Sequence, residues 1–204
     1  MDKAVKVLVV DDDSDFARLI EKRIVKDKRL AFVGNAAYSA SGVDMARSLQ
    51  PDVVVMDLSL SGDDDRGYEG VEAAKEIRIS TNAKIVLLTA HEDPETMKAA
   101  SKNAFASAFV CKSHYQTLTD DIYYSATSDT PQKEFIKELV LNELSPAERA
   151  VLDDFIKEKT LGGKGGAYSA CGSCAKTIAN QKRSILNKLK LRNTKELMSV
   201  FGNW

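Results

Sequence analysis

The sequence predicts an α/β protein: a doubly wound, five-stranded parallel sheet followed by a small all-α domain. Five short runs of Val, Ile and Leu alternate with helical patterns in the first two thirds of the 204-residue chain. Such strands are almost wholly apolar because helices cover both faces of a parallel sheet. After Leu144 no strand pattern occurs, and apolar residues recur at helical spacing instead.

The elements of the sheet are predicted in strict alternation. Strands are expected at residues 6–10, 30–35, 52–56, 84–89 and 108–111. Helices are expected at residues 14–26, 41–49, 70–79, 94–103 and 115–125. The first helix has its apolar stripe at Phe16, Leu19, Ile20 and Ile24, and Pro51 limits the second. The polar stretch 125–131 (SATSDTP) predicts a linker, and a helix over 132–142 follows.

These patterns divide the chain into a first domain at 1–126, a linker with a helix at 127–143 and a second domain at 144–204. Ser145, Pro146 and Glu148 predict a helix start with a capping box, in which the Ser and Glu side chains each bond the other's backbone amide. A long helix is expected from about Ala175 to Leu189, and Thr194 is expected to cap the last one.

The net charge of −1 hides a division between the two halves. Residues 1–143 carry 18 Lys and Arg against 25 Asp and Glu, and residues 144–204 carry 11 against 5. The halves therefore have net charges of −7 and +6, which suggests different partners: a cation or phosphate chemistry for the first and a polyanion for the second. The alternative is a chance clustering of charges on solvated faces.

Composition points to a cytoplasmic protein. No apolar run approaches the roughly 20 residues that a membrane helix needs, and the N-terminus meets acidic residues before a signal peptide could form. Three Cys fit a reducing compartment. Cys171 and Cys174 form a single C-x-x-C without a second pair, so we expect no zinc site; a reversible disulfide is the alternative. The Gly-rich segment before Lys176 lacks the P-loop pattern.

Polar residues follow the predicted strands at the points where ligands bind to open parallel sheets. Asp11 and Asp12 follow the first strand, Asp57 the third, Thr89 ends the fourth, and Lys112 follows the fifth. Crowded carboxylates repel unless a cation is present, and hard oxygen ligands suit Mg²⁺. The cluster leaves Asp57 as a nucleophile for a phosphoryl group, with Mg²⁺ and Lys112 stabilising the charge. Acidic residues also favour helix N-termini, which accounts for Asp13 and Asp15.

The segments VLVVDD, PDVVVMDL, IVLLTA and FVCK resemble those of a response-regulator receiver domain, a flavodoxin-like fold, over residues 4–126. The resemblance implies that Asp57 accepts phosphate from a histidine kinase. It implies a Mg²⁺ site formed by Asp11, Asp12 and Asp57 with the Ser59 backbone carbonyl. It also implies that Thr89 and Phe109 form the switch pair and that Lys112 is the invariant Lys of the family. A register with Asp12 and Asp13 as the metal acids stays open.

The first domain departs from the family pattern in three places. The loop between Asp57 and Gly70 is about five residues longer and contains DDDRGYE. Ser113 stands where the family has Pro. Ser59 and His91 each lie two residues after a site residue, where they could gate attacking water; simple exposure is the alternative for His91.

The second domain resembles the LuxR-type (NarL/FixJ-like) helix-turn-helix output domain through LSPAERAVLDDF and TIANQKRSILNKLKLRNTKELMSVF. On composition alone, a solvated basic face fits its long helix equally well. The resemblance implies a recognition helix from Ala175 to about Lys190 that binds double-stranded DNA. Expected DNA contacts are Lys176, Thr177, Asn180, Lys182 and Arg183. The last helix, 195–201, matches the dimerisation helix, so a homodimer is expected when the protein is active.

The family places a further helix where this chain has LGGKGGAYSACGSCA, with five Gly. Gly disfavours a helix interior by up to ~1 kcal/mol at each position, so this scaffold helix should be shortened, mobile or ordered only on binding. We therefore predict a phosphorylation-dependent transcription regulator and keep two alternatives: an output that binds a protein partner, and a redox-sensitive regulator independent of phosphorylation. Apart from self-catalysed phosphotransfer and autodephosphorylation at Asp57, no enzymatic activity is expected.

Overall fold

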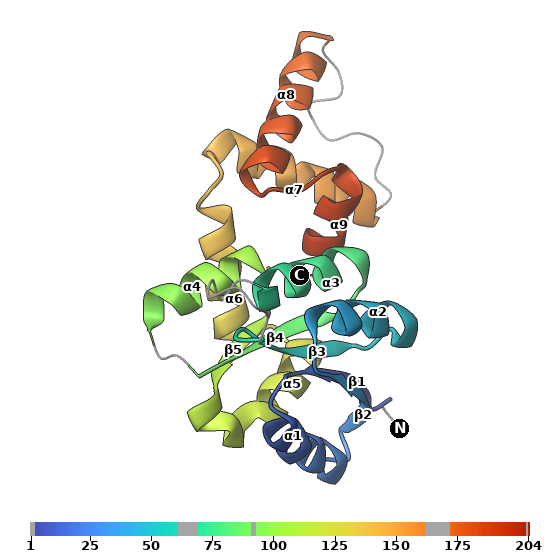
Figure 1. Cartoon of the computed structure of the whole chain (residues 1–204). Coiled ribbons are helices and arrows are strands. Elements are labelled where there is room, and N and C mark those ends of the chain that lie inside the picture. Colours follow the sequence, from blue (N-terminus) through green and yellow to red (C-terminus); the bar gives the residue numbers. More distant parts are fainter. Residues whose placement is uncertain (1–2, 61–68, 91–92, 162–171, 203) are drawn as a thin grey trace. The chain divides into compact units, whose positions relative to one another are not determined.

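The computed structural model describes residues 3–60, 69–90, 93–161, 172–202 and 204 (Figure 1). The chain forms two compact units, Met1–Lys137 and Glu138–Trp204. The loop that contains most of DDDRGYE, His91 and most of the Gly-rich segment lie outside the described residues, as do the side chains of Cys171 and Cys174. The predictions made for them stay predictions.

The first unit is built on a parallel sheet of five strands: β1 Val5–Val10, β2 Leu30–Ala36, β3 Val53–Asp57, β4 Lys84–Thr89 and β5 Ala108–Cys111. Their order is β2-β1-β3-β4-β5, and every neighbouring pair is parallel. This confirms the predicted fold class. The strand order reverses between β1 and β3, and open parallel sheets bind their ligands at such a switch point, beyond the carboxyl ends of the strands.

Five α-helices cover the two faces of the sheet: α1 Ser14–Lys26, α2 Ser39–Leu49, α3 Glu69–Ser80, α4 Pro94–Asn103 and α5 Leu118–Thr127. In the first unit, α1 and α5 lie on one face and α2, α3 and α4 on the other (Figure 1). Asp13 caps α1, because its Oδ1 accepts hydrogen bonds from the Asp15 and Phe16 amides at 3.0 and 3.1 Å. The capping interpretation of Asp13 is therefore confirmed.

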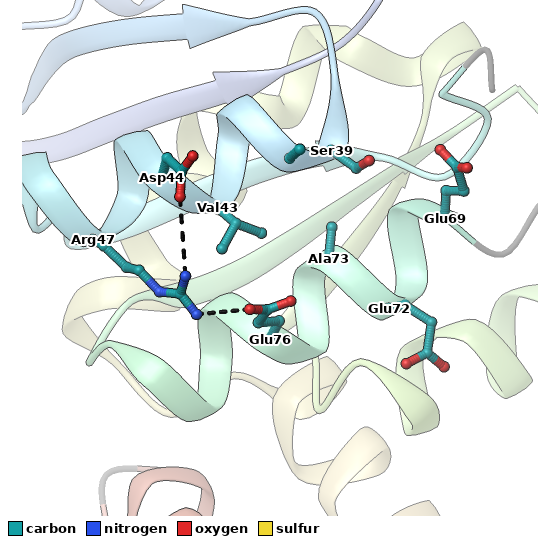
Figure 2. Close-up of a pocket in the computed structure, with 9 residues that line it drawn as sticks. Ser39, Val43, Asp44, Arg47, Glu69, Glu72, Ala73 and Glu76 are labelled. Atoms are coloured by element: carbon teal, nitrogen blue, oxygen red, sulfur yellow. Dashed lines mark hydrogen bonds and ion pairs between the residues drawn. The ribbon is translucent and has the colours of Figure 1, made fainter.

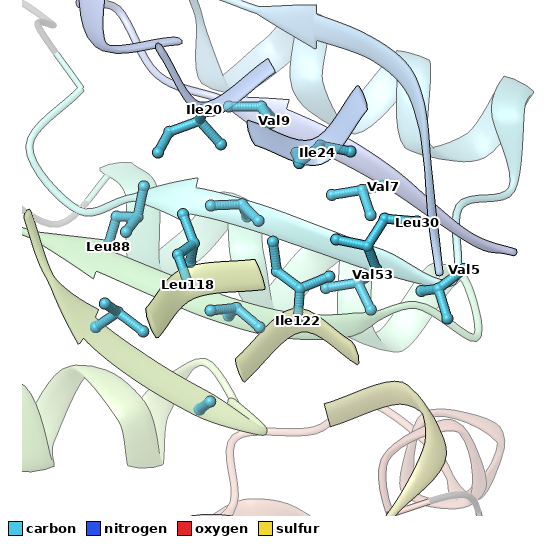
Figure 3. Close-up of a cluster of buried hydrophobic side chains, with 14 residues drawn as sticks. Val5, Val7, Val9, Ile20, Ile24, Leu30, Val53, Leu88, Leu118 and Ile122 are labelled. Carbon is cyan, nitrogen blue, oxygen red and sulfur yellow. The ribbon is translucent and has the colours of Figure 1, made fainter. Parts of the chain in front are cut away.

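The face under α1 and α5 holds one continuous apolar cluster (Figure 3). Alternate strand residues such as Val7 and Val9 meet Ile20 and Ile24 of α1 and Ile122 of α5, each at most 1% exposed. Side chains alternate between the faces of a strand, so the remaining apolar strand residues pack under the helices on the other face. Burial on both faces explains why these strands are apolar at nearly every position.

The chain enters α5 differently from the prediction. The expected helix start at Tyr115 is wrong: a 3₁₀-helix, η1, spans Lys112–Thr117, and the α-helix begins at Leu118. His114 has a non-helical backbone (φ −113°, ψ 28°), which interrupts a regular helix. The tighter turn places the Tyr115 ring edge-on against Phe16, with ring centroids 6.0 Å apart.

Helix α6, Pro131–Leu141, follows α5 and contains the boundary between the two units. Its N-terminal part belongs to the sheet unit: Gln132 Nε2 donates to the Phe109 carbonyl at 3.0 Å, and Ile136, within the bounds of the same unit, is fully buried. Lys133 is 5% exposed and pairs with Asp129 at 2.7 Å. Part of the segment 127–143 thus belongs to the first compact unit.

The second unit contains α7 Pro146–Leu161, α8 Gly172–Lys188 and α9 Thr194–Phe201. The predicted capping box is present: the Ser145 amide donates to Glu148 Oε2 at 2.7 Å, and the Glu148 amide donates to Ser145 Oγ at 3.3 Å. The predicted cap at Thr194 is wrong. Asn193 caps α9 instead, since its Oδ1 accepts from the amides of Lys195 and Glu196, and Asn is the better capping residue.

Glu148 also joins α7 to α8, and this contact makes the stability of the second unit depend on pH. Lys188 Nζ lies 2.7 Å from Glu148 Oε2, and this hydrogen bond lowers the pKa of Glu148 to about 2. A depressed carboxyl pKa stabilises the folded state above pH ~4.5, and that stabilisation is lost as the pH falls toward 2.

We therefore expect Glu148→Gln to lower the free energy of unfolding of the second unit by ~1–2 kcal/mol at pH 7, allowing for solvent screening. The measurement is urea unfolding followed by the fluorescence of Trp204, the only Trp of the chain. The difference from the unmodified chain should shrink below pH 4.5. Glu158→Gln, on the exposed side of α7, is the control. Equal stability of both variants at pH 7 would contradict the assignment.

Within the described residues, no helix is both long and apolar enough to span a bilayer.

Candidate functional site

The carboxyl ends of β1, β3 and β4 bring together the polar residues that the sequence placed there. Asp11 directly follows β1 and is 1% exposed, and Asp57, the last residue of β3, is 2% exposed. Asp57 pairs in register with Leu88, so Thr89 lies one residue further along the neighbouring strand. Two buried acids and a buried hydroxyl therefore meet at the predicted edge.

Lys112 enters this pocket from the end of β5. Its Nζ lies 2.7 Å from Asp57 Oδ2 and 2.8 Å from Asp11 Oδ2. The ammonium thus bridges the two acids. The other oxygen of Asp57, Oδ1, accepts a hydrogen bond from the Ser59 amide at 3.1 Å. Both oxygens of Asp57 are held, which fixes the orientation of its carboxylate.

The electrostatics of the pocket balance burial against ion pairing. Burial raises the pKa of Asp11, and the Asp57 charge adds to this, while the hydrogen bond from Lys112 opposes it; the net shift is upward. Burial also disfavours the charged form of Lys112, but its bonds with Asp11 and Asp57 outweigh burial and raise its pKa. One cation is therefore shared by acids that would otherwise repel each other.

The acids fit a single hard divalent cation. Asp11, Asp12 and Asp57 offer carboxylate oxygens that all lie within 4.8 Å of one another. Carboxylate oxygens are the ligands that Mg²⁺ prefers in proteins. Asp13 is exposed and caps α1, so the structure favours the first of the two registers, with Asp11 and Asp12 in the pocket.

The two residues predicted as a switch occupy neighbouring strands. Thr89 is 1% exposed, and Phe109 is half-buried in β5 at the edge of the sheet. The Phe109 carbonyl accepts the bond from Gln132 of α6. A change in β5 would therefore reach α6 directly, a connection that the sequence analysis did not predict.

Two further residues shape the pocket. Gly70, in the first turn of α3, lies so close to β3 that a Cβ atom there would be 2.2 Å from the Asp57 carbonyl oxygen. Phe16 of α1 lies under Lys112, with Nζ 4.7 Å from its ring centroid. The sequence marked Gly70 as the end of a loop and Phe16 as part of an apolar stripe, but neither pattern shows which site residue they contact.

A separate groove of about 420 Å³ lies between α2 and α3 (Figure 2). Arg47 reaches across it to Glu76 at 2.6 Å and lies 4.0 Å from Asp44. Glu69 and Glu72 add two more acids to its lining. None of the pocket residues at the sheet edge lines this groove, and acidic side chains alone do not identify a ligand.

In the second unit, α8 presents the predicted basic face. Lys176, Thr177, Asn180 and Arg183 are all exposed, while Ile185 and Leu189 of the opposite stripe are buried. Lys182 differs from the other expected contacts. Its Nζ lies 4.6 Å from the ring centroid of Phe155 on α7, so its side chain covers that ring. The exposed basic face of α8 therefore contains four of the five residues that the sequence predicts as DNA contacts.

Comparison with curated proteins and family models concerns the first unit. A family model, "Response regulator receiver domain", matches residues 7–122. Protein-glutamate methylesterase/protein-glutamine glutaminase 2 of Photobacterium profundum is 42% identical over 73 residues, 36% of this chain and 17% of that protein. The equivalent protein of Natronomonas pharaonis is 36% identical over 85 residues, 42% of this chain and 22% of that protein. The similarity thus spans about a fifth of these relatives.

Solved structures resemble the whole chain. A Salmonella typhimurium RcsB response regulator has a TM-score of 0.55 at 22% identity, covering 97% of this chain and 96% of that one. A two-component response regulator RcsB–DNA complex has a TM-score of 0.54 at 21% identity, covering 98% and 100%. At such identities the likeness shows the fold alone. The family match, which spans more than half of the residues, places this chain in the response regulator receiver domain family.

Proposed function

We propose that this chain is a cytoplasmic, phosphorylation-dependent transcription regulator. Asp57 accepts a phosphoryl group from a histidine kinase, and its phosphorylation controls DNA binding by residues 144–204. The observation that carries the proposal is the buried Asp57 carboxylate, held by Lys112 on one oxygen and the Ser59 amide on the other. A carboxylate fixed in this way beside a second cation site is suited to attack phosphorus.

Each pocket residue has a defined part in the transfer. An Asp57 oxygen forms the new bond to phosphorus as the bond to the donor nitrogen breaks, and the donor imidazole leaves. Lys112 neutralises charge on the transferred group from 2.7 Å away in the resting state. Mg²⁺, held by Asp11, Asp12 and Asp57 with the Ser59 carbonyl, supplies further neutralisation of that charge when bound. No other enzymatic activity is proposed.

The signal leaves the pocket through Thr89 and Phe109. Thr89 offers a buried hydroxyl next to Asp57, which suits a hydrogen bond to a phosphoryl oxygen. Phe109 follows on the adjoining strand, and its carbonyl bond to Gln132 gives α6 a direct contact with β5. We propose that this contact carries the change toward residues 144–204.

DNA binding is assigned to the exposed face of α8, which is basic and polar: Lys176, Thr177, Asn180 and Arg183. Lys and Arg neutralise phosphates, and Asn and Arg can read base edges. The LuxR-type resemblance and the fold of the RcsB structures, one of them a DNA complex, support this assignment. Dimerisation through α9 would present two such helices to an inverted repeat.

The test is selection from a randomised duplex-DNA pool by the full chain in reductant, with and without beryllofluoride and Mg²⁺ as a phosphate mimic. We expect an inverted repeat to be enriched more strongly with the mimic. If nothing is enriched in either state although the mimic still changes the oligomeric state, DNA binding is not the output, and the alternative of a protein partner is favoured. Lys182 covers the Phe155 ring and Lys188 pairs with Glu148, so two cations of α8 already have partners within the second unit, and this observation favours the second function.

On the selected duplex, Arg183→Ala should weaken binding by roughly tenfold and reduce the log–log salt slope by about one, since each phosphate contact releases about one counterion. Fluorescence anisotropy over a series of salt concentrations measures both. Lys157→Ala, an exposed residue of α7, is the matched control and should leave the slope unchanged. A slope that is identical in both variants would exclude Arg183 from the DNA interface.

A further inference from the structure

The ammonium group of Lys112 has a third partner besides its two acids. The aromatic ring of Phe16 lies beneath it, with 4.7 Å between Nζ and the ring centroid. A cation within about 6 Å of an aromatic face is attracted by the ring quadrupole, and the attraction grows when water is partly excluded. Only 18% of the Lys112 side chain is exposed. The contact thus combines favourable distance with partial burial.

The ring itself is firmly held. Phe16 packs against the apolar cluster under α1 and α5, and the Tyr115 ring meets it edge-on at 6.0 Å with an interplanar angle of 76°. The Arg23 guanidinium lies 5.2 Å from the Tyr115 centroid and donates to the Gln116 carbonyl at 2.8 Å. A series of contacts therefore leads outward from the pocket: the Lys112 ammonium lies on the Phe16 ring, and the Phe16 ring meets the Tyr115 ring, which carries the Arg23 guanidinium.

We propose that Phe16 is a positioning residue that keeps the Lys112 ammonium beside Asp57. The inference rests on the proposed function and extends it to a residue that acts through Lys112. Asp11 is both a partner of Lys112 and one of the three carboxylates suited to Mg²⁺. The Asp11 bond is therefore the contact for which a bound cation competes. A bound cation does not compete for the ring of Phe16, so the ring holds the Lys112 ammonium both with and without a cation at the three carboxylates.

The experiment compares Phe16→Leu, which keeps an apolar side chain, with Phe16→Tyr, which keeps the ring. The first measurement is NMR of lysines labelled with ¹³C at Cε, without Mg²⁺ or phosphodonor, with the Lys112 signal assigned from Lys112→Arg. Protons over an aromatic face are shifted upfield. We expect this shift in the unmodified chain and in Phe16→Tyr, and its loss in Phe16→Leu.

The second measurement is the rate of phosphorylation by acetyl phosphate with Mg²⁺, followed by intact mass. Loss of a partly desolvated cation–π contact should slow Phe16→Leu by roughly fivefold, with recovery in Phe16→Tyr. If Phe16 had only a structural role, the Lys112 chemical shift and the phosphorylation rate would not both be lost in Phe16→Leu and both be retained in Phe16→Tyr.

Two results would overturn the inference: a Lys112 signal unchanged in Phe16→Leu, or a phosphorylation rate equal to that of the unmodified chain. If the unmodified chain takes up no phosphate at all while the upfield shift is present, the proposed function fails and the positioning role fails with it, but the ring contact stands. The NMR result therefore separates the two failures.

Discussion

Replacing Asp57 with Asn is expected to abolish phosphate uptake from acetyl phosphate and to leave the chain folded. An amide is not a nucleophile toward phosphorus, so the rate should fall by ~1,000-fold or more. The substitution is nearly isosteric, and it removes one of three acids that share a pocket with a single lysine. Relief of that repulsion offsets the loss of the Lys112 ion pair, so thermal stability without Mg²⁺ should change little.

Intact mass after incubation with acetyl phosphate and Mg²⁺ measures the uptake. Asp44→Asn is the matched control: this residue lies on α2 with 81% of its side chain exposed, and its replacement should leave the rate unchanged. Undiminished phosphorylation of Asp57→Asn would move the acceptor to another carboxylate, with Asp11 and Asp12, both within 4.8 Å, as the candidates. The same variant should lose the response of DNA binding to acetyl phosphate.

Among the glycines of the first unit that the structure describes, replacing Gly70 with Ala is expected to have the largest effect on stability. The new Cβ would meet backbone atoms of β3, at 2.2 Å from the Asp57 carbonyl oxygen and 2.9 Å from the Leu58 Cα. Backbone cannot rotate away as a side chain can, so α3 or β3 must shift. Overpacking of this kind should lower the free energy of unfolding by ~3 kcal/mol or more.

Because the displaced strand is the one that carries Asp57, the variant should also be phosphorylated more slowly even where it remains folded. Urea unfolding followed by far-ultraviolet circular dichroism measures the stability. Gly42→Ala is the control, since its Cβ would press on side-chain atoms of Val10 at 2.8 Å, which can move. It should therefore lose less stability than Gly70→Ala. A larger loss of stability in Gly42→Ala than in Gly70→Ala would show that α3 can move away from β3 at little energetic cost.

The sequence predicts the sheet well because burial on both faces leaves an unambiguous pattern. The bounds of β4, β5, α1 and α4 agree with the prediction at every residue. The placement of Asp11, Asp57 and Lys112 at one edge follows from the same alternation, since the carboxyl ends of parallel strands meet. The start of α5 does not follow, because the 3₁₀ turn at His114 depends on the packing of Tyr115 rather than on apolar spacing.

The features that the sequence did not predict arise from contacts between segments that are distant in the sequence. The sequence predicts Phe16 only as part of an apolar stripe and predicts no role for Phe155; the fold shows that the ring of each contacts a lysine. Gln132 begins the helix predicted inside the linker segment 127–143, but nothing in the sequence predicts its bond to Phe109, 23 positions away. The spacing of apolar residues predicts which face of a helix is buried, but it does not predict which residues of other segments contact that face.

The position of α6 has a consequence for how such a protein can change over evolution. New signalling proteins often arise when an input domain is joined to a different output domain through a linker that makes few contacts with either domain. Here the boundary between compact units falls inside one helix, after Lys137. A cut at residue 126 would leave the Phe109 carbonyl without Gln132 and the sheet unit without Ile136. The two modules are therefore expected to be inherited together, and successful chimeras should keep α6 with the sheet.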